Sequence, residues 1–250
     1  MSDRYRQQRY RPPSGGFGGP GLTPIVQRLL IANVAVFLVQ MFSPGNLIEV
    51  LGVSVHGVFQ SLQLWQPFTY MWAHGSFMHV AFNMFALWIF GPQLELAWGS
   101  RKFLRFYLQC GIGAGFIILG WNTLLGSASV TLGASGAVFG LLTAFSLMWP
   151  DQTIQLIFPP VSFRAIWFIP LLFLMQLLMS QGNISHIGHL GGVLVAGFIM
   201  RDAARRAIGF SSLRYRWHRW RMRGKLRAVR REEFERKRPR KDDDDRPTLH

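Results

Sequence analysis

Long apolar segments separated by short polar connections fill the chain between residues 24 and 200. The hydrocarbon core of a bilayer is about 30 Å thick, and about 20 apolar helical residues cross it. By this measure the pattern predicts six membrane helices, at residues 25–42, 77–97, 103–124, 135–149, 165–180 and 187–200. The fourth is short, because about 15 residues rise only about 22 Å, so it must begin or end below the membrane surface. The sequence therefore predicts an all-α polytopic membrane protein.

Charged residues are concentrated at the two ends of the chain. They make up only 16% of the sequence, whereas soluble domains average about 25%. The formal net charge of +15 comes mainly from the ends, with +3 in residues 1–23 and +10 in residues 201–250. We therefore divide the chain into a flexible, basic Gly/Pro-rich tail (1–23), a membrane domain (24–200) and a basic, partly disordered tail (201–250).

The positions of Lys and Arg in the connections predict the topology. Residues 44–100 contain neither, whereas the next connection holds Arg101, Lys102 and Arg105, and the connection after the fourth segment holds Arg164. Cytoplasmic loops carry an excess of Lys and Arg. Six spans with both termini in the cytoplasm satisfy this alternation.

The second basic tail has two interpretations. Residues 214–231 interleave aromatic residues with arginines, a pattern that suits an anionic lipid surface but also RNA or DNA. Because the tail directly follows a membrane segment, we expect it to contact anionic lipid, and we expect no nucleic-acid partner.

Polar residues gather near the outer ends of three predicted spans that run in the same direction. His79 and Asn83 begin the second span, Ser135 begins the fourth, and His186 and His189 begin the sixth. A polar residue inside a membrane costs free energy and therefore indicates a function. Since the topology was derived from charge alone, the shared depth of these residues is independent support for one site.

A serine and a histidine at the same depth suggest nucleophilic catalysis. Histidine can remove the proton of a serine hydroxyl near neutral pH, and asparagine, histidine or backbone N–H groups can stabilise an oxyanion. Asp151 and Glu95 lie at other depths, so the residues predict a Ser–His dyad with no acidic third member. A zinc site built from His74, His79, His186 and His189 would lack a nearby carboxylate, and we expect no metal.

Small residues recur on two of these segments. Gly136 and Gly140 form a G-x-x-x-G pair in the fourth segment, and Gly192 and Ala196 form a small-x-x-x-small pair in the sixth. Such pairs let helix backbones approach closely. We expect them to pack the two segments together near the predicted dyad.

Three stretches resemble the rhomboid intramembrane serine proteases. They are LWQPFTYMWAHGSFMHVAFNMFALWIFGPQLELAWGS from Leu64, GASGAVFG from Gly133 and HLGG from His189. The similarity spans residues 24–200 and implies a six-helix rhomboid-like bundle. It implies Ser135 as nucleophile and His189 as general base, with His79, Asn83 and the Ser135 N–H as oxyanion donors. Some family members have Trp-Arg where this chain has Trp65–Gln66, which leaves open any ion pair involving Glu95.

The resemblance implies an endopeptidase that cuts other transmembrane proteins near the outer end of a helix, without a cofactor. Cleavage should favour helices that unwind easily, because a helix hides its carbonyl groups in hydrogen bonds. Two rival functions remain open: a catalytically silent scaffold or chaperone for membrane helices, and a transporter with a histidine proton relay. We expect a multi-pass protein of a bacterial inner membrane.

Overall fold

The computed structural model describes residues 21–155, 161–179 and 186–207. Its contacts divide the chain into one unit from Met1 to Ala204 and a second from Arg205 to His250. The N-terminal tail up to residue 20, the connection at 180–185 and the basic tail beyond residue 207 lie outside the described residues. The flexibility and lipid contact expected of the tails therefore stay predictions.

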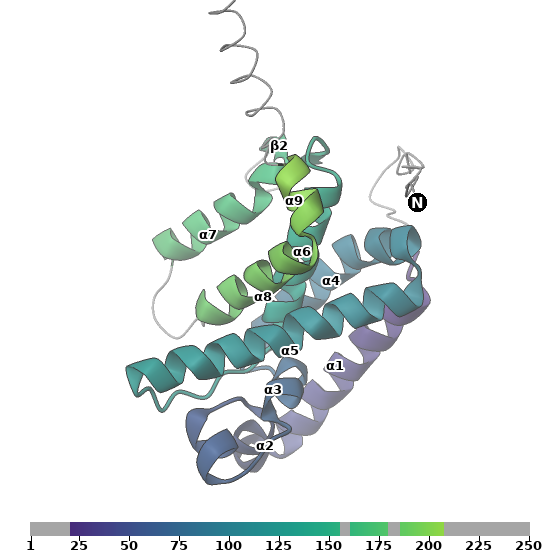
Figure 1. Cartoon of the computed structure of the whole chain (residues 1–250). Helices are drawn as coiled ribbons and strands as arrows, with labels where there is room; N and C mark the ends of the chain where they lie inside the picture. Colours follow the sequence, from purple (N-terminus) through teal and green to yellow (C-terminus); the bar gives the residue numbers. More distant parts are fainter. Residues whose placement is uncertain (1–20, 156–160, 180–185, 208–250) are drawn as a thin grey trace, which may run out of the picture. The chain divides into compact units, whose positions relative to one another are not determined.

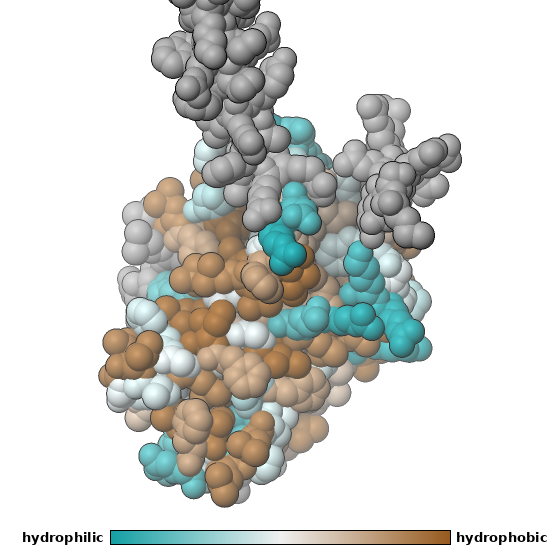
Figure 2. Space-filling view, viewed as in Figure 1, coloured by the Kyte–Doolittle hydropathy of each residue, from teal (hydrophilic) through white to brown (hydrophobic). Residues whose placement is uncertain are grey.

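Among the residues that the structure describes, three helices are long and apolar enough to cross a membrane: α1 (Pro24–Phe42), α4 (Phe77–Trp98) and α5 (Ser100–Leu125). Each exposes large apolar side chains, including Leu38 in α1 and Phe82 in α4. Figure 2 shows apolar side chains over much of the centre of one face, with hydrophilic ones mainly toward its margins. An apolar surface of this kind suits lipid contact.

The other three predicted segments form shorter apolar helices. These are α6 (Ser135–Met148), α7 (Phe168–Met179) after the 3₁₀ turn η3 (Ala165–Trp167), and α8 (His186–Ile199), which α9 (Arg201–Ala207) follows. All six predicted segments are thus helical, with ends within about three residues of those expected. The 14 residues of α6 rise about 21 Å, which is less than the thickness of a bilayer core.

The connection between α1 and α4 is folded into short helical elements. They are α2 (Pro44–Leu51), the π-helical turn η1 (His56–Gln60), α3 (Gln66–Thr69) and the 3₁₀ turn η2 (Tyr70–Trp72). Backbone hydrogen bonds join Val53 of this connection to Thr131, which lies between α5 and α6, at 3.0 and 2.9 Å. The α1–α4 connection and the α5–α6 connection are therefore linked.

A short hairpin corrects the all-α prediction. Strands β1 (Thr153–Gln155) and β2 (Ser162–Arg164) pair antiparallel, and Arg164 forms an ion pair with Asp151. Pro150 follows α6 and cannot continue a helix, so the next residues are extended and satisfy their backbone groups by pairing. Strands of three residues are too short to show a period of two in the sequence.

α6 lies among the other helices (Figure 1), in contact with α4, α5, α7 and α8. Every residue from Gly136 to Ser146 is buried. A helix that is apolar on all sides is stable where other helices surround it. The short fourth segment is therefore the centre of the fold, and its first residue is Ser135.

The side chain of Glu95, near the end of α4, contacts the start of α1. Its carboxylate accepts hydrogen bonds from Thr23 Oγ1 at 2.5 Å, from the N–H groups of Ile25 and Val26, each at 3.0 Å, and from Ser100 Oγ at 2.5 Å. The carboxylate thus satisfies free N–H groups in the first turn of α1. Within the described ranges Glu95 forms no ion pair, so hydrogen bonds take the place of the ion pair that the sequence left open.

Candidate active site

Ser135 is half-buried at the first position of α6. The turn before it contains Gly133, whose φ of +119° is a conformation that side-chain-bearing residues rarely adopt. The N–H of Gly133 donates to the carbonyl of Tyr70 at 2.9 Å, and the N–H of Ala134 donates to His74 Nε2 at 3.4 Å. These bonds fix the turn, so Ser135 stands where a helix offers free N–H groups and the positive end of its dipole.

His74 supports this turn from the connection before α4. Only 2% of the residue is exposed, and its backbone exchanges two hydrogen bonds with the Gln40 side chain of α1, at 2.9 and 3.2 Å. Burial, and then the neighbouring His79, lower the pKa of His74 to about 4. His74 is therefore neutral near pH 7, as an acceptor for the Ala134 N–H must be. The sequence offered His74 as a member of a possible zinc site, and the structure places it, buried, beside the turn before Ser135.

His79 and Asn83 lie on successive turns of α4. The His79 ring meets the His74 ring edge to face, with centroids 5.1 Å apart. It also covers Gly133, where an added Cβ would lie 2.6 Å from His79 Cε1 and Nε2. Asn83 is buried, and its Nδ2 donates to the carbonyl of His79 at 2.9 Å. The structure therefore brings His79 to the turn before Ser135, while Asn83 uses one N–H within its own helix.

The helices α6 and α8 approach most closely at glycines. A Cβ on Gly192 would overlap the carbonyl oxygen of Gly136, and a Cβ on Gly136 would lie 3.3 Å from the carbonyl oxygen of Gly188. On the α5 side, a Cβ on Gly140 would lie 2.5 Å from Cys110 Cβ. Ala196, one turn beyond Gly192, is fully buried. Larger side chains at the two facing glycines would force the helix backbones apart.

His189 packs flat against α6. Its ring stacks on the Phe139 ring, with centroids 4.3 Å apart and an angle of 8° between the planes, and 8% of the residue is exposed. Phe139 follows Ser135 by four residues and so lies one turn away on the same face of α6. His189 therefore lies against the helix that begins with Ser135, one turn along it. His186, one turn before His189, is half-buried.

The arrangement combines a hydroxyl, three buried or half-buried imidazoles (His74, His79 and His189) and free backbone N–H groups. These groups can supply a nucleophile, a proton acceptor and oxyanion donors. In the part of the chain that the structure describes, no three His, Cys, Asp or Glu residues lie close enough together to hold a metal ion. Acid–base and nucleophilic chemistry is thus the kind that these residues can perform.

Comparisons with known proteins agree with the motifs. A model of the rhomboid domain matches residues 61–205. RHOMBOID-like protein 1 of Arabidopsis thaliana is 27% identical over 212 residues, which cover 70% of this chain and 52% of that protein. Rhomboid protein 1, mitochondrial, of Saccharomyces cerevisiae is 33% identical over 132 residues, which cover 49% of this chain and 37% of that protein. Presenilin-associated rhomboid-like protein A, mitochondrial, of Danio rerio is 30% identical over 126 residues, which cover 49% of this chain and 33% of that protein.

These relatives also bear on location and on length. Those whose names give a compartment are mitochondrial, and this finding overturns the expectation of a bacterial inner membrane. The chain spans about half or less of the length of these relatives. The rhomboid model itself matches more than half of the chain and includes Ser135 and His189. The chain therefore belongs to the rhomboid family.

Proposed function

We propose that this chain is an intramembrane serine endopeptidase that uses Ser135 as nucleophile and His189 as general base. The packing of α8 on α6 carries the proposal most directly. Gly192 meets the Gly136 backbone, and His189 stacks on the turn that follows Ser135. Only small residues at this contact allow an imidazole from one helix to reach the start of the other.

In the proposed reaction, a ring nitrogen of His189 takes the proton of the Ser135 hydroxyl while Oγ attacks the scissile carbonyl carbon. The tetrahedral intermediate collapses to an acyl-enzyme as the protonated His189 gives its proton to the leaving amine. Water, deprotonated by His189, then attacks the ester carbon. His189 gives that proton to Ser135 Oγ as the ester bond breaks, which releases the new carboxyl group and restores the Ser135 hydroxyl. No cofactor takes part in this scheme.

The proposed oxyanion donors are the Ser135 N–H, His79 and Asn83. Contact of the His79 ring with Gly133 supports its role, because that turn leads directly to Ser135. Asn83 retains a second amide N–H besides the one that bonds the His79 carbonyl. Donors held in advance by the fold stabilise negative charge without a cost of reorganisation during the reaction.

The proposal includes six membrane crossings with both termini in the cytoplasm and transmembrane proteins as substrates. Short α6 supports a site below the outer surface, since its 14 residues leave about 9 Å of the bilayer core uncovered. Water can then reach Ser135 from the outer side. A substrate helix that unwinds near its outer end would expose a carbonyl at that depth. The basic tail would contact anionic lipid on the cytoplasmic side.

A cleavage assay tests the function. The purified chain, in vesicles, is offered a panel of single-span proteins, and its activity is compared with that of the Ser135→Ala variant. We expect cleavage of some panel members by the wild type and none by the variant. Binding of panel members without cleavage would favour a scaffold or chaperone, and solute flux that persists in Ser135→Ala would favour a transporter.

A further inference from the structure

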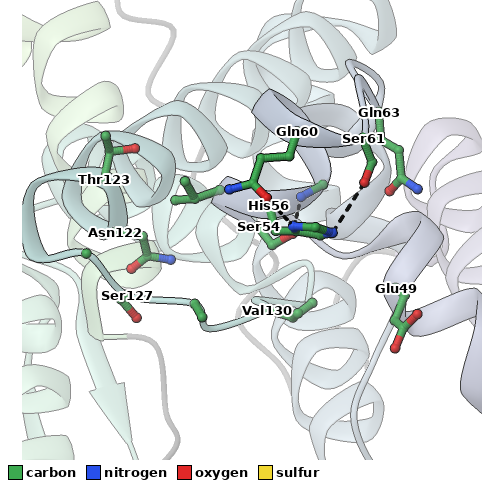
Figure 3. A pocket seen from close by; sticks show the side chains of 14 residues that line it. Glu49, Ser54, His56, Gln60, Ser61, Gln63, Asn122, Thr123, Ser127 and Val130 are labelled. Carbon is green, nitrogen blue, oxygen red and sulfur yellow. Dashed lines mark hydrogen bonds between the residues drawn. The ribbon is translucent and has the colours of Figure 1, made fainter.

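The two ends of α5 differ in charge. At its C-terminal end, Asn122 and Thr123 line a polar pocket of about 630 Å³, together with side chains of the α1–α4 connection (Figure 3). None of the 14 residues that line this pocket is Lys or Arg. At the N-terminal end of the helix, Arg101, Lys102 and Arg105 are all exposed, and they are the only cations of α5. An anionic ligand on this helix therefore finds cationic partners at the N-terminal end alone.

Polar side chains continue from this end along one face of α5. Arg101, Arg105 and Gln109 follow at intervals of four residues, so each lies about 6 Å beyond the one before it on the same face. Gln109 is exposed, although α5 is long and apolar enough to cross a membrane. Figure 2 shows hydrophilic side chains over the N-terminal half of α5, whose course Figure 1 draws. We call Arg101, Lys102, Arg105 and Gln109 the α5 strip.

The charge of the α5 strip is not balanced within the described part of the chain, where none of its three cations takes part in an ion pair. The nearest acid in the sequence, Glu95, is buried, and its carboxylate accepts hydrogen bonds from Thr23 and Ser100 instead. The Gln109 side chain likewise has no hydrogen bond to another described residue. An amide that faces lipid costs free energy unless it has a polar partner. The strip therefore offers positive charge and amide N–H groups to a ligand from outside the fold.

The order of side chains along α5 matches the order of groups in a phospholipid. The 26 residues of the helix rise about 39 Å, so a crossing α5 extends past a hydrocarbon core of about 30 Å into the headgroups. Lys102 lies over the Trp98 ring, 5.9 Å from its centroid, and tryptophan is enriched at the level of the headgroups. Gln109 lies one turn deeper than Arg105, and the half-buried Ile112 follows it on the same face. Cations, an amide and apolar surface thus succeed one another, as phosphate, ester and acyl chain do.

We propose that the α5 strip binds one anionic phospholipid of the surrounding leaflet, with the lipid phosphate between Arg101 and Arg105. Guanidinium groups bind phosphate through charge-assisted, often paired hydrogen bonds. Lys102 adds charge at the rim, the Gln109 amide donates to an ester carbonyl of the lipid, and an acyl chain lies along Ile112. The excess of cations on cytoplasmic loops accounts for Arg101 and Lys102 at the membrane surface, but it gives no reason for an exposed amide two turns deeper. The lipid supplies the partner that this amide needs, whether or not the chain is a protease.

Fluorescence quenching by brominated lipids tests the proposal. The full chain with Cys110→Ala and Ile112→Cys is labelled with bimane and placed in phosphatidylcholine vesicles, where brominated phosphatidylglycerol or brominated phosphatidylcholine quenches the label on contact. We expect phosphatidylglycerol to be enriched at position 112 by about five-fold or more, as for at least one cation acting at a membrane surface. Phe116→Cys, one turn further on the same face and 60% exposed, is a second label position. Val34→Cys, which is exposed on α1, should show no such enrichment.

Substitutions in the labelled chain make the test specific. Arg105→Gln should lower the preference for phosphatidylglycerol by about two- to five-fold. Arg28→Gln, which removes the same charge from an exposed position of α1, should leave the preference unchanged. Gln109→Leu should also lower it, although no charge changes, because only a lipid held by the arginines has its ester group fixed beside the amide. Thermal unfolding in detergent checks that each variant is folded.

Three results would overturn the proposal. Equal quenching by the two lipids at position 112 would show that no anionic lipid is selected there. Equal effects of Arg28→Gln and Arg105→Gln, with none from Gln109→Leu, would show a diffuse attraction of anionic lipid to the whole basic chain. Loss of the preference when inorganic phosphate is added at constant ionic strength would show that the α5 strip holds the free anion rather than a lipid.

Discussion

Ser135 is surrounded by side chains that lie far from it in the sequence. The sequence identifies it, together with His79 and His189, by residue type and by depth. It does not identify the supports, because Tyr70 acts through its backbone carbonyl and backbone contacts leave no trace in residue type. Gln40 is different, because it is a polar residue near the end of an apolar segment. A polar residue there costs free energy, and this could have indicated a partner such as His74, to which Gln40 is hydrogen-bonded.

The proposed base predicts how the rate depends on pH. A protonated His189 cannot accept the Ser135 hydrogen, so kcat/KM should fall once the pH is low enough to protonate His189. His74 stays neutral down to about pH 5, because its pKa is lowered to about 4, so a fall in rate above that pH would not come from His74. The measurement uses a substrate without histidine, with folding checked at each pH. A rate that stays unchanged down to the lowest pH at which the protein remains folded would exclude His189 as the base.

Among the elements, the six helical segments follow directly from apolar length, whereas the hairpin does not. β1 and β2 form because the backbone groups after Pro150 must be paired. No pattern of side chains predicts this pairing. The fold of the α1–α4 connection could not be predicted from the sequence either, because its short helices are held by single polar residues such as Gln66. Element contacts nevertheless give two sharp predictions.

The first concerns the start of α1. Glu95→Gln replaces a carboxylate that accepts from the N–H groups of Ile25 and Val26 and from two hydroxyls. We expect the free energy of unfolding to fall by about 2 kcal/mol, because charge-assisted bonds are lost in a buried place. Thermal unfolding in detergent measures the change. Glu49→Gln, at an exposed carboxylate, is the matched control and should alter stability by less than about 0.5 kcal/mol; equal effects would refute the capping role.

The second concerns the contact between α6 and α8. Gly192→Ala places a methyl group on the Gly136 carbonyl, so the helices must separate at a cost of about 1–3 kcal/mol. We expect most proteolytic activity to be lost as well, because His189 moves with α8. Gly197→Ala in the same helix meets open space and should retain both stability and activity. If the two variants behaved alike, close packing at Gly192 would not matter for the site.

At the scale of the whole molecule, the sequence predicts a membrane protein from composition, and the exposed apolar surface agrees with it. Six crossings are harder to predict, since within the described residues only α1, α4 and α5 have the length of a span. The shorter α6 is buried by its neighbours, whereas α8 exposes Leu194 and Phe198. The burial of α6 is thus a property of the assembled bundle, which periodicity along one segment cannot express.

Cysteine accessibility tests the proposed topology. The single native cysteine, Cys110, is buried and can be replaced by Ala to give a cysteine-free background. Gln60→Cys and Lys102→Cys then mark exposed positions before and after α4. An impermeant maleimide should modify position 60 only from outside and position 102 only from inside. Modification of both from the same side would rule out a crossing by α4 between them.

The most direct test of the account is labelling with a serine-directed fluorophosphonate in membranes. The wild type, Ser135→Ala, His189→Ala and Ser146→Ala are compared, the last being a buried hydroxyl of the same helix that bonds its own backbone. We predict that the wild type and Ser146→Ala are labelled, and that Ser135→Ala and His189→Ala are not. Labelling that persisted in a folded Ser135→Ala or His189→Ala variant would contradict the proposed Ser135–His189 pair.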